Sequence, residues 1–229
     1  MRFKYALLGA ALMASGIGVA AAQDATTYDP GQLPAIQGKV AQYSLTPRGD
    51  VDGLILADGT EVHLPPHLGT QLVFAVKPGD AVTVHGLRAR AIPMVQAMSV
   101  SNDATGATVT DNGRDGPGGP RGTQQALTAE GRVKAQLHGP RGDLNGALLE
   151  DGTIVRLPPP EAERLAADLT PGAHLYAEGN GFAGPLGRVI EATSIGPTQN
   201  QLAQIAAPPR PPKGPERRPP PPPPGPAPG

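Results

Sequence analysis

One pattern occurs twice along this chain of 229 residues, and the two copies are in register. The matching segments lie 93 positions apart and are Gly38–Val40 and Gly131–Val133, Pro47–Asp50 and Pro140–Asp143, Asp58–Thr60 and Asp151–Thr153, Leu64–Pro66 and Leu157–Pro159, and Gly86 and Gly179. No gap interrupts the match from Gly38 to Gly86. Such a duplication predicts two copies of one small domain.

The first residues have the features of an export signal. Arg2 and Lys4 are basic, Ala6–Ala14 is an apolar stretch too short to span a bilayer, and Val19–Ala22 supplies small residues for cleavage. We therefore expect residues 1–22 to be a signal peptide and the mature protein to be periplasmic or secreted. An uncleaved N-terminal anchor is the alternative. No later segment is long and apolar enough to predict a transmembrane helix.

The absence of cysteine excludes disulfides and thiolate metal sites throughout the chain. The formal net charge is −1, and it becomes more negative if a leader carrying Arg2 and Lys4 is removed. Such a charge gives no general attraction to nucleic acid or to an anionic membrane. Aromatic residues make up 3% of the chain, so few rings are available for stacking on a ligand.

Composition divides the chain into segments. We expect one domain over residues 36–101, a flexible Gly-rich linker over 102–125 and a second domain over 126–197. Residues 208–229 are mostly Pro, which predicts a disordered tail of polyproline II character.

Each repeat predicts mostly β structure. Loose alternation and strand-breaking residues place strands at 37–45, 51–57, 60–64, 80–87 and 94–100, and at the equivalent positions of repeat two. Asp58-Gly59 and Asp151-Gly152 predict tight hairpins, because the turn needs positive φ. A short helix is predicted between the third and fourth strands, more strongly over 160–169 than at Leu68–Val76, where Gly and β-branched residues weaken it.

Three strands, a helix and two further strands is the order of the five-stranded OB-fold barrel. By this order, the helix position and the Asp-Gly-Thr hairpin, each repeat resembles a small bacterial OB-fold domain. The whole chain resembles an exported protein with two tandem OB-fold-like domains and a Pro-rich C-terminal tail. The resemblance implies an all-β fold of two small barrels. An SH3-like barrel is the competing prediction, although such barrels carry only a short 3₁₀ turn where this sequence predicts a helix.

The resemblance also implies where a ligand binds: on strands two and three, framed by the loop after strand one and the loop between strands four and five. The first of these loops carries Arg48 and Asp50 in repeat one and Arg141 and Asp143 in repeat two. The arginines could hold a carboxylate or phosphate. Every residue type in Pro-Arg-Gly-Asp also forms turns, so a purely structural role is the alternative. A cell-adhesion signal is a third possibility for Arg-Gly-Asp.

The loop between strands four and five differs between the copies. Repeat one has the basic residues Arg88 and Arg90, whereas repeat two has a neutral loop over 180–185 that carries Phe182. The arginines are candidates for anion contacts and Phe182 for stacking on a base or sugar. Solvated arginines and a ring that plugs the barrel end are the alternatives. Arg156, in the groove of repeat two, completes the candidate ligand contacts.

No catalytic residue, cofactor or metal site is predicted. There is no Gly-x-Ser-x-Gly or His-Glu-x-x-His motif. His63, His67 and His85 have no histidine counterparts in repeat two, and we expect them to face solvent. Residues 51–64 and 144–157 contain no aromatic side chain, which argues against nucleic-acid binding.

The Pro-rich tail carries four basic residues, which are Arg210, Lys213, Arg217 and Arg218, and one acidic residue, Glu216. A basic polyproline II rod can attach to an anionic envelope polymer or dock in an aromatic groove of an envelope protein. A solvated spacer is the alternative. These features predict a non-enzymatic binding or scaffolding module of the bacterial cell envelope. The other hypotheses are an accessory subunit of an envelope enzyme or transporter and a binder of single-stranded nucleic acid or oligosaccharide.

Overall fold

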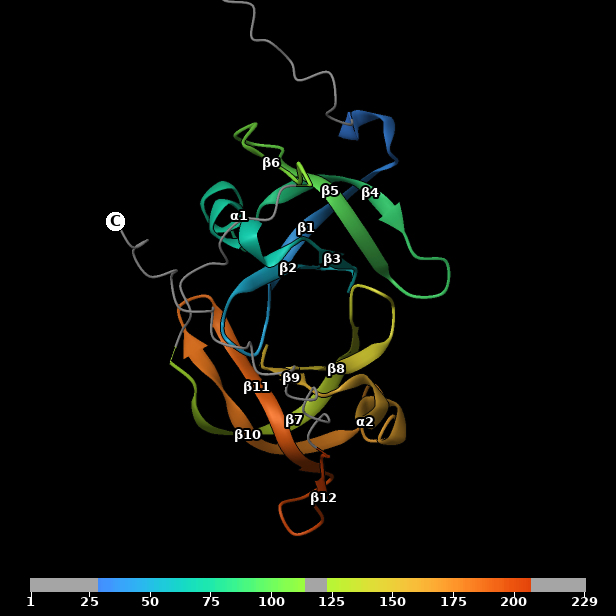
Figure 1. The fold of residues 1–229 in the computed structure, drawn as a ribbon, viewed down its shortest axis with the longest axis vertical. Helices are drawn as coiled ribbons and strands as arrows, with labels where there is room; N and C mark the ends of the chain where they lie inside the picture. The colour runs from blue at the N-terminus through green and yellow to red at the C-terminus, as the bar shows by residue number, and fades with distance from the viewer. Residues whose placement is uncertain (1–28, 114–122, 207–229) are drawn as a thin grey trace, which may run out of the picture.

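The computed structural model describes residues 29–113 and 123–206. The predicted signal peptide at 1–22 and the predicted tail at 208–229 lie outside the described residues. Within these ranges the chain forms two β-barrels that follow one another along the long axis of the molecule, the first above the second in Figure 1.

The first repeat contains six strands and three short helical segments. They are η1 (Pro30–Gln32), β1 (Ala35–Leu45), β2 (Val51–Leu56), β3 (Glu61–His63), η2 (Pro66–Leu68), α1 (Gly69–Ala75), β4 (Ala81–Arg88), β5 (Met94–Asn102) and β6 (Thr108–Thr110). β1 pairs antiparallel with β2 and β4, β2 with β3, and β4 with β5. A parallel pairing of β3 with β5 closes the barrel.

The second barrel repeats this topology. Its elements are β7 (Gln125–His138), β8 (Leu144–Leu149), β9 (Ile154–Arg156), α2 (Pro159–Arg164), β10 (His174–Gly184), β11 (Gly187–Gly196) and β12 (Ala203–Gln204). β7 pairs with β8 and β10, β8 with β9, β10 with β11, and a parallel pairing of β9 with β11 closes the barrel. The prediction of two five-stranded OB-like barrels is therefore confirmed.

The Asp-Gly hairpins form as predicted. Gly59 and Gly152 have φ values of 86° and 87°, which residues other than glycine rarely adopt. Asp58 accepts hydrogen bonds from the backbone N–H and the hydroxyl of Thr60, both at 2.9 Å. Asp151 accepts the same pair from Thr153, at 2.8 and 2.9 Å. Each Asp-Gly-Thr turn thus joins the second and third strands of its barrel.

The helices differ from expectation in their relative length. α1 in repeat one has seven residues, whereas α2 ends after six, and turns with i→i+3 hydrogen bonds follow it. These turns bury Leu169 completely, so packing of the side chain outweighs the helical pattern over 160–169. In α1, a Cβ atom on Gly69 would lie 2.3 Å from the carbonyl oxygen of Val51, so glycine lets this helix approach β2.

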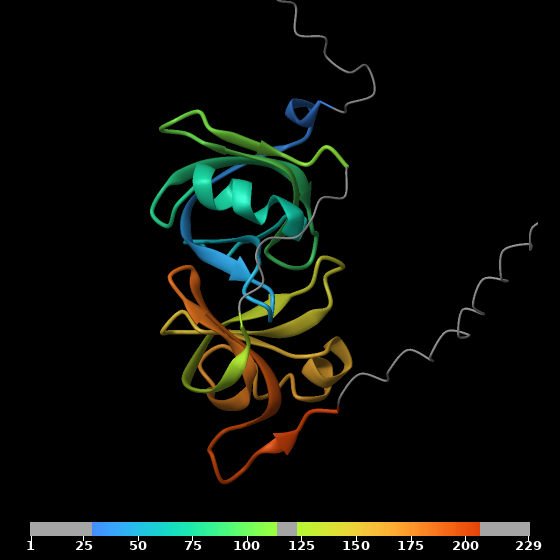
Figure 2. The same cartoon turned by 60° about the vertical axis from the view of Figure 1, so that its left-hand side comes forward.

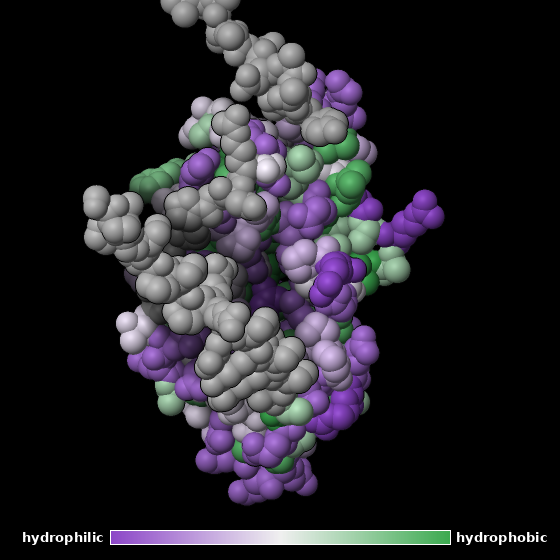
Figure 3. All heavy atoms as spheres, viewed as in Figure 1, coloured by the Kyte–Doolittle hydropathy of each residue, from purple (hydrophilic) through white to green (hydrophobic). Residues whose placement is uncertain are grey.

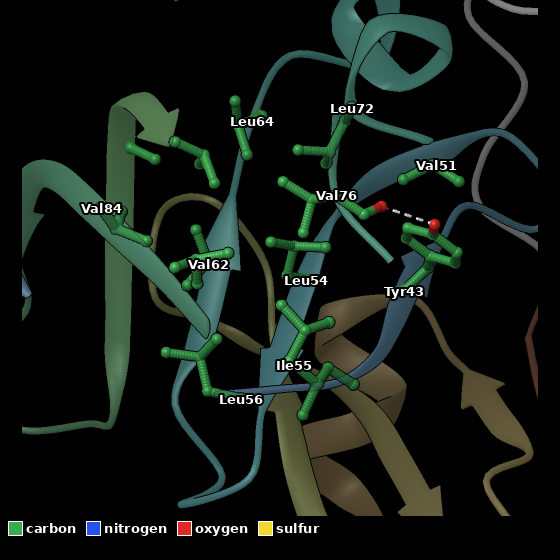
Figure 4. Packing of buried hydrophobic residues seen from close by; sticks show 14 of the residues in the cluster. Tyr43, Val51, Leu54, Ile55, Leu56, Val62, Leu64, Leu72, Val76 and Val84 are labelled. Carbon is green, nitrogen blue, oxygen red and sulfur yellow. Dashed lines mark hydrogen bonds between the residues drawn. The ribbon is translucent and has the colours of Figure 1, made fainter. Parts of the chain in front are cut away.

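Leu54, Leu72 and Val84 belong to one buried cluster, the hydrophobic core of the first barrel (Figure 4). The buried Tyr43 hydroxyl donates a hydrogen bond of 2.7 Å to the carbonyl oxygen of Val76, which satisfies it inside this core. Four residues of the second barrel belong to the same apolar cluster, and they are Leu137, Leu148, Ile154 and Val189. The two barrels therefore share a buried apolar interface.

The linker predicted from composition overlaps strands of the structure. Residues 102–125 are expected to be a linker, yet β5 continues to Asn102 and β6 pairs with β5. Val109 is buried in the first barrel, although the surrounding Gly and Thr residues suggest a linker by composition. Residues 114–122, in the centre of the predicted linker, lie outside the described residues.

No helix in the described part of the chain has the length and hydropathy needed to cross a membrane. The face of the molecule drawn in Figure 3 shows hydrophobic residues in small patches between hydrophilic ones.

Candidate functional site

The barrels meet through the faces that the OB-fold resemblance assigns to ligand. The loops after strand one, the third strands and the β10–β11 hairpin all contribute to this interface. In Figure 2 that hairpin (orange) reaches from the second barrel to the first. At its tip Gly187 approaches Leu45, whose Cδ1 atom lies 3.1 Å from the position of a Cβ atom on residue 187. The expected ligand faces are thus covered by protein.

Arg156 lies inside this interface and is only 6% exposed. Its guanidinium donates hydrogen bonds to the Ser44 hydroxyl (2.9 Å), the Leu45 carbonyl (3.3 Å) and Asn145 Oδ1 (2.8 Å). Asp52 Oδ2 lies 3.9 Å from the same guanidinium. Arg156, predicted from the sequence to contact a ligand, therefore forms its hydrogen bonds within the protein, and two of the three join the barrels.

Glu61 is a second buried charged group at the interface, 4% exposed. It accepts hydrogen bonds from the backbone N–H of His138 (2.9 and 3.1 Å to its two oxygens), and Oε1 lies 2.8 Å from His138 Nδ1. Burial by itself would raise the pKa of Glu61, but the hydrogen bonds from His138 and the nearby His63 ring together outweigh it, so the pKa is lowered from its ordinary value. The carboxylate is thus held ionised between the two barrels.

The expectation that His63 faces solvent is wrong. It is buried, with Nε2 3.7 Å from Glu61 Oε2, too far for a hydrogen bond. His67 is half-buried, and His85 approaches the Leu33 carbonyl at 3.1 Å. Across residues 29–113 and 123–206, no three His, Asp or Glu side chains are grouped in a way that could hold a metal ion.

Phe182 lies in a strand, whereas the sequence predicts a loop over residues 180–185. β10 continues to Gly184, and only Pro185 and Leu186 separate it from β11. The glycines that suggest a loop allow close strand pairing: a Cβ atom on Gly181 would lie 2.0 Å from the Val189 carbonyl oxygen. The Phe182 ring packs directly on Gly49, where a Cβ atom would lie 2.6 Å from it.

The remaining arginines of the prediction are exposed. Arg48 and Arg141 lie in turns closed by backbone hydrogen bonds of 2.8–2.9 Å, as the turn interpretation of Pro-Arg-Gly-Asp expects. Asp50 and Asp143, in the same loops, are half-buried. Gly142 approaches Ile92, so the loop of Arg141 lies beside the β4–β5 loop, which contains Arg90 and follows Arg88 at the end of β4.

A pocket of about 210 Å³ lies beside α1. Residues from both barrels line it, since Val73 and Phe74 come from α1 and Leu186 from the β10–β11 turn. Asp50 also lines it, and its Oδ1 atom is buried without a hydrogen-bond partner among the described residues. Phe74 is 84% exposed, the most exposed large hydrophobic side chain in the described ranges.

Sequence reasoning missed Glu61, His138 and Ser44. The available signal was a difference between the copies: 93 positions away from these residues stand Ile154, Leu45 and Leu137. A polar residue that replaces an apolar one within an otherwise repeated pattern marks a position where the two copies have different surroundings.

Comparison with known proteins adds no relative to this description. No family model, curated protein or solved structure matches the chain. The likeness to OB-folds therefore depends on strand order and pairing alone.

Proposed function

We propose that the protein is a non-enzymatic binding or scaffolding module of the bacterial cell envelope, and that its barrels contact a partner at the pocket beside α1. The observation that carries this proposal is the exposure of Phe74 at an apolar hollow. An exposed aromatic ring next to a concave apolar surface is typical of a contact site. A partner that inserts an apolar side chain here buries Phe74 as well.

The construction of the pocket fits a scaffolding role. Its wall is made by α1 of the first barrel and Leu186 of the second, so it depends on the pairing of the barrels. Because the pairing buries charged and apolar groups together, the two walls are held at a fixed separation. A rigid site loses little conformational entropy when a partner binds.

The tail supplies a second contact in this proposal. Arg210, Lys213, Arg217 and Arg218 lie outside the described residues, and their sequence favours attachment to an anionic envelope polymer or envelope protein. Export through the predicted signal peptide would bring the chain to that compartment. The two contacts differ in chemistry, one apolar and one electrostatic, and salt therefore separates them.

The test measures retention of the mature protein on envelope material at low and high salt. Deletion of Pro208–Gly229 should remove the salt-sensitive part of retention and leave barrel melting unchanged. Phe74→Ser should remove the part that persists at high salt. Leu87→Ser is the matched control, because Leu87 is 62% exposed and lies on β4, away from the pocket.

Two results would contradict the proposal. If Phe74→Ser is retained at high salt as well as Leu87→Ser, the pocket is not the contact of the barrels. If the protein without its tail is retained at low salt as well as the full chain, the electrostatic contact belongs to the barrels, and Arg48, Arg88, Arg90 and Arg141 become the residues to replace.

A further inference from the structure

The contacts between the barrels occur in reciprocal pairs. Gly49 of the first barrel packs against the Phe182 ring of the second, and its counterpart Gly142 approaches Ile92 of the first, with Ile92 Cδ1 3.5 Å from the position of a Cβ atom. Both contacts join the loop after strand one to the hairpin formed by strands four and five, at Phe182 on β10 in one case and at Ile92 between β4 and β5 in the other. An interface in which each face contains both members of a contact pair has two-fold character.

The third strands follow the same relation. Arg156, on β9, reaches Leu45 at the end of β1. The counterpart of Leu45 is His138 at the end of β7, and it contacts Glu61, which lies on β3 with His63, the counterpart of Arg156. The two repeats are therefore paired about a pseudo-two-fold axis, as two copies of one domain would be in a symmetric dimer.

The polar groups at the interface break this symmetry. Glu61 stands where repeat two has Ile154, and its partner His138 stands where repeat one has Leu45. Arg156 donates to Ser44, where repeat two has Leu137. Each buried charge thus has one partner side chain that only the other repeat provides, His138 for Glu61 and Ser44 for Arg156.

From this asymmetry we propose that the face formed by the strand-one end, the third strand and the adjoining loops of each barrel is a recognition surface that selects the other repeat over a second copy of itself. In a pair of two first repeats, Glu61 would meet Leu45 and lose its contact with the imidazole of His138. In a pair of two second repeats, Arg156 would meet Leu137 and lose the Ser44 hydroxyl. The loss of a hydrogen-bonding side chain by a buried charge disfavours both pairings, while the apolar cluster supplies the attraction.

The experiment cuts the folded full chain. A protease site replaces residues 115–119, the purified protein is cleaved, and native mass spectrometry weighs the products. The expected species contains one half of each kind, since the interface persists without the peptide connection. Separation of the halves at micromolar concentration overturns the proposal, and so does a population of like pairs equal to that of unlike pairs.

Two substitutions test the origin of the selectivity. His138→Leu should weaken the association of the halves about a hundredfold, because Glu61 loses its imidazole partner while buried. His174→Leu is the matched control, an exposed histidine of the same half. Combining His138→Leu with Glu61→Ile recreates the apolar types found at Leu45 and Ile154 and should restore association.

Each outcome of this series shows whether the Glu61–His138 pair determines the selectivity between repeats. If the His138→Leu halves associate as tightly as those of the control, or if Glu61→Ile does not restore association, the polar pair does not determine the selectivity. Should His138→Leu alone prevent the full chain from folding, recovery of the folded, associated halves in the double variant supports the proposal, and failure to recover them overturns it.

Discussion

The two repeats are nearly identical in their hairpins but different in the residues they place at the interface. Both Asp-Gly-Thr turns make the same two hydrogen bonds, at 2.9 and 2.9 Å in one barrel and 2.8 and 2.9 Å in the other. At the interface, by contrast, Arg156 makes three side-chain hydrogen bonds, whereas Nε2 of its counterpart His63 makes none among the described residues.

This difference separates two kinds of constraint on a duplicated sequence. The hairpin is a local structure, so each copy needs the same residues to form it. The interface is a tertiary structure in which each copy meets the other one, so complementary residues serve better than identical ones. The matching Asp-Gly-Thr turns therefore belong to the barrels, whereas the changes at Glu61 and Ile154 and at His138 and Leu45 lie at the contact between barrels.

The largest effect that tests this comparison is expected at Arg156. Arg156→Met should lower the free energy of unfolding by about 3 kcal/mol, because Ser44, Asn145 and the Leu45 carbonyl lose their buried donor. His63→Met, at the matching position, should cost no more than about 1 kcal/mol, because no hydrogen bond of Nε2 is lost. Chemical denaturation of the full chain measures both.

Equal losses of unfolding free energy in Arg156→Met and His63→Met would show that the two matching positions do not contribute differently to the interface. A substitution in a surface ion pair provides the background level: Arg164→Met removes the contacts of an exposed arginine with Glu161 and with the Gln204 carbonyl, and should cost less stability than Arg156→Met.

The sequence predicts the barrels well because their signals are local. Asp-Gly pairs, Pro pairs after the third strand and alternating apolar residues each restrict the backbone within a few residues. The outcome over 180–185 shows the limit of such signals. Glycine permits a loop but also permits close strand pairing, and only the position of β11 decides between them.

The candidate site could be predicted only in part. The resemblance to OB-folds indicates a face to which Arg156 and Phe182 contribute, and in the structure both side chains contact the other repeat. What covers that face is the other repeat, and no local pattern encodes a contact between residues more than 70 positions apart, such as Glu61 with His138. Phe74 was also missed, because a single aromatic residue in an apolar helix ordinarily indicates a core position.

At the matching hairpins we expect a loss of stability that is smaller than at Arg156 and equal in the two repeats. Gly59→Val and Gly152→Val should each lower the unfolding free energy by about 2 kcal/mol, since valine is forced to a positive φ value at both turns. Thermal or chemical denaturation of the two single variants makes the comparison. A loss in only one of them would mean that the hairpins, despite matching hydrogen bonds, do not contribute alike.

The smallest effect is the acid dependence of the interface, which involves Glu61 in repeat one and has no counterpart at Ile154. A carboxyl group whose pKa is lowered by folding contributes stability above its ordinary pKa, and this contribution is lost as the pH falls through the folded value. The free energy of unfolding of the wild type should therefore fall with acidification more steeply than that of Glu61→Gln.

The useful window runs from about pH 5 to about pH 3, below the ordinary pKa of histidine, so that titration of carboxyl groups dominates the change. Unfolding free energies at both ends give the slope for the wild type and for Glu61→Gln, and Glu150→Gln, at an exposed turn residue of the second barrel, should keep the slope of the wild type. Parallel curves for the wild type and Glu61→Gln would show that His138 does not hold the carboxylate in its ionised form. The asymmetry of the interface would then depend on Arg156 alone, and the pairing of the barrels would be insensitive to acid.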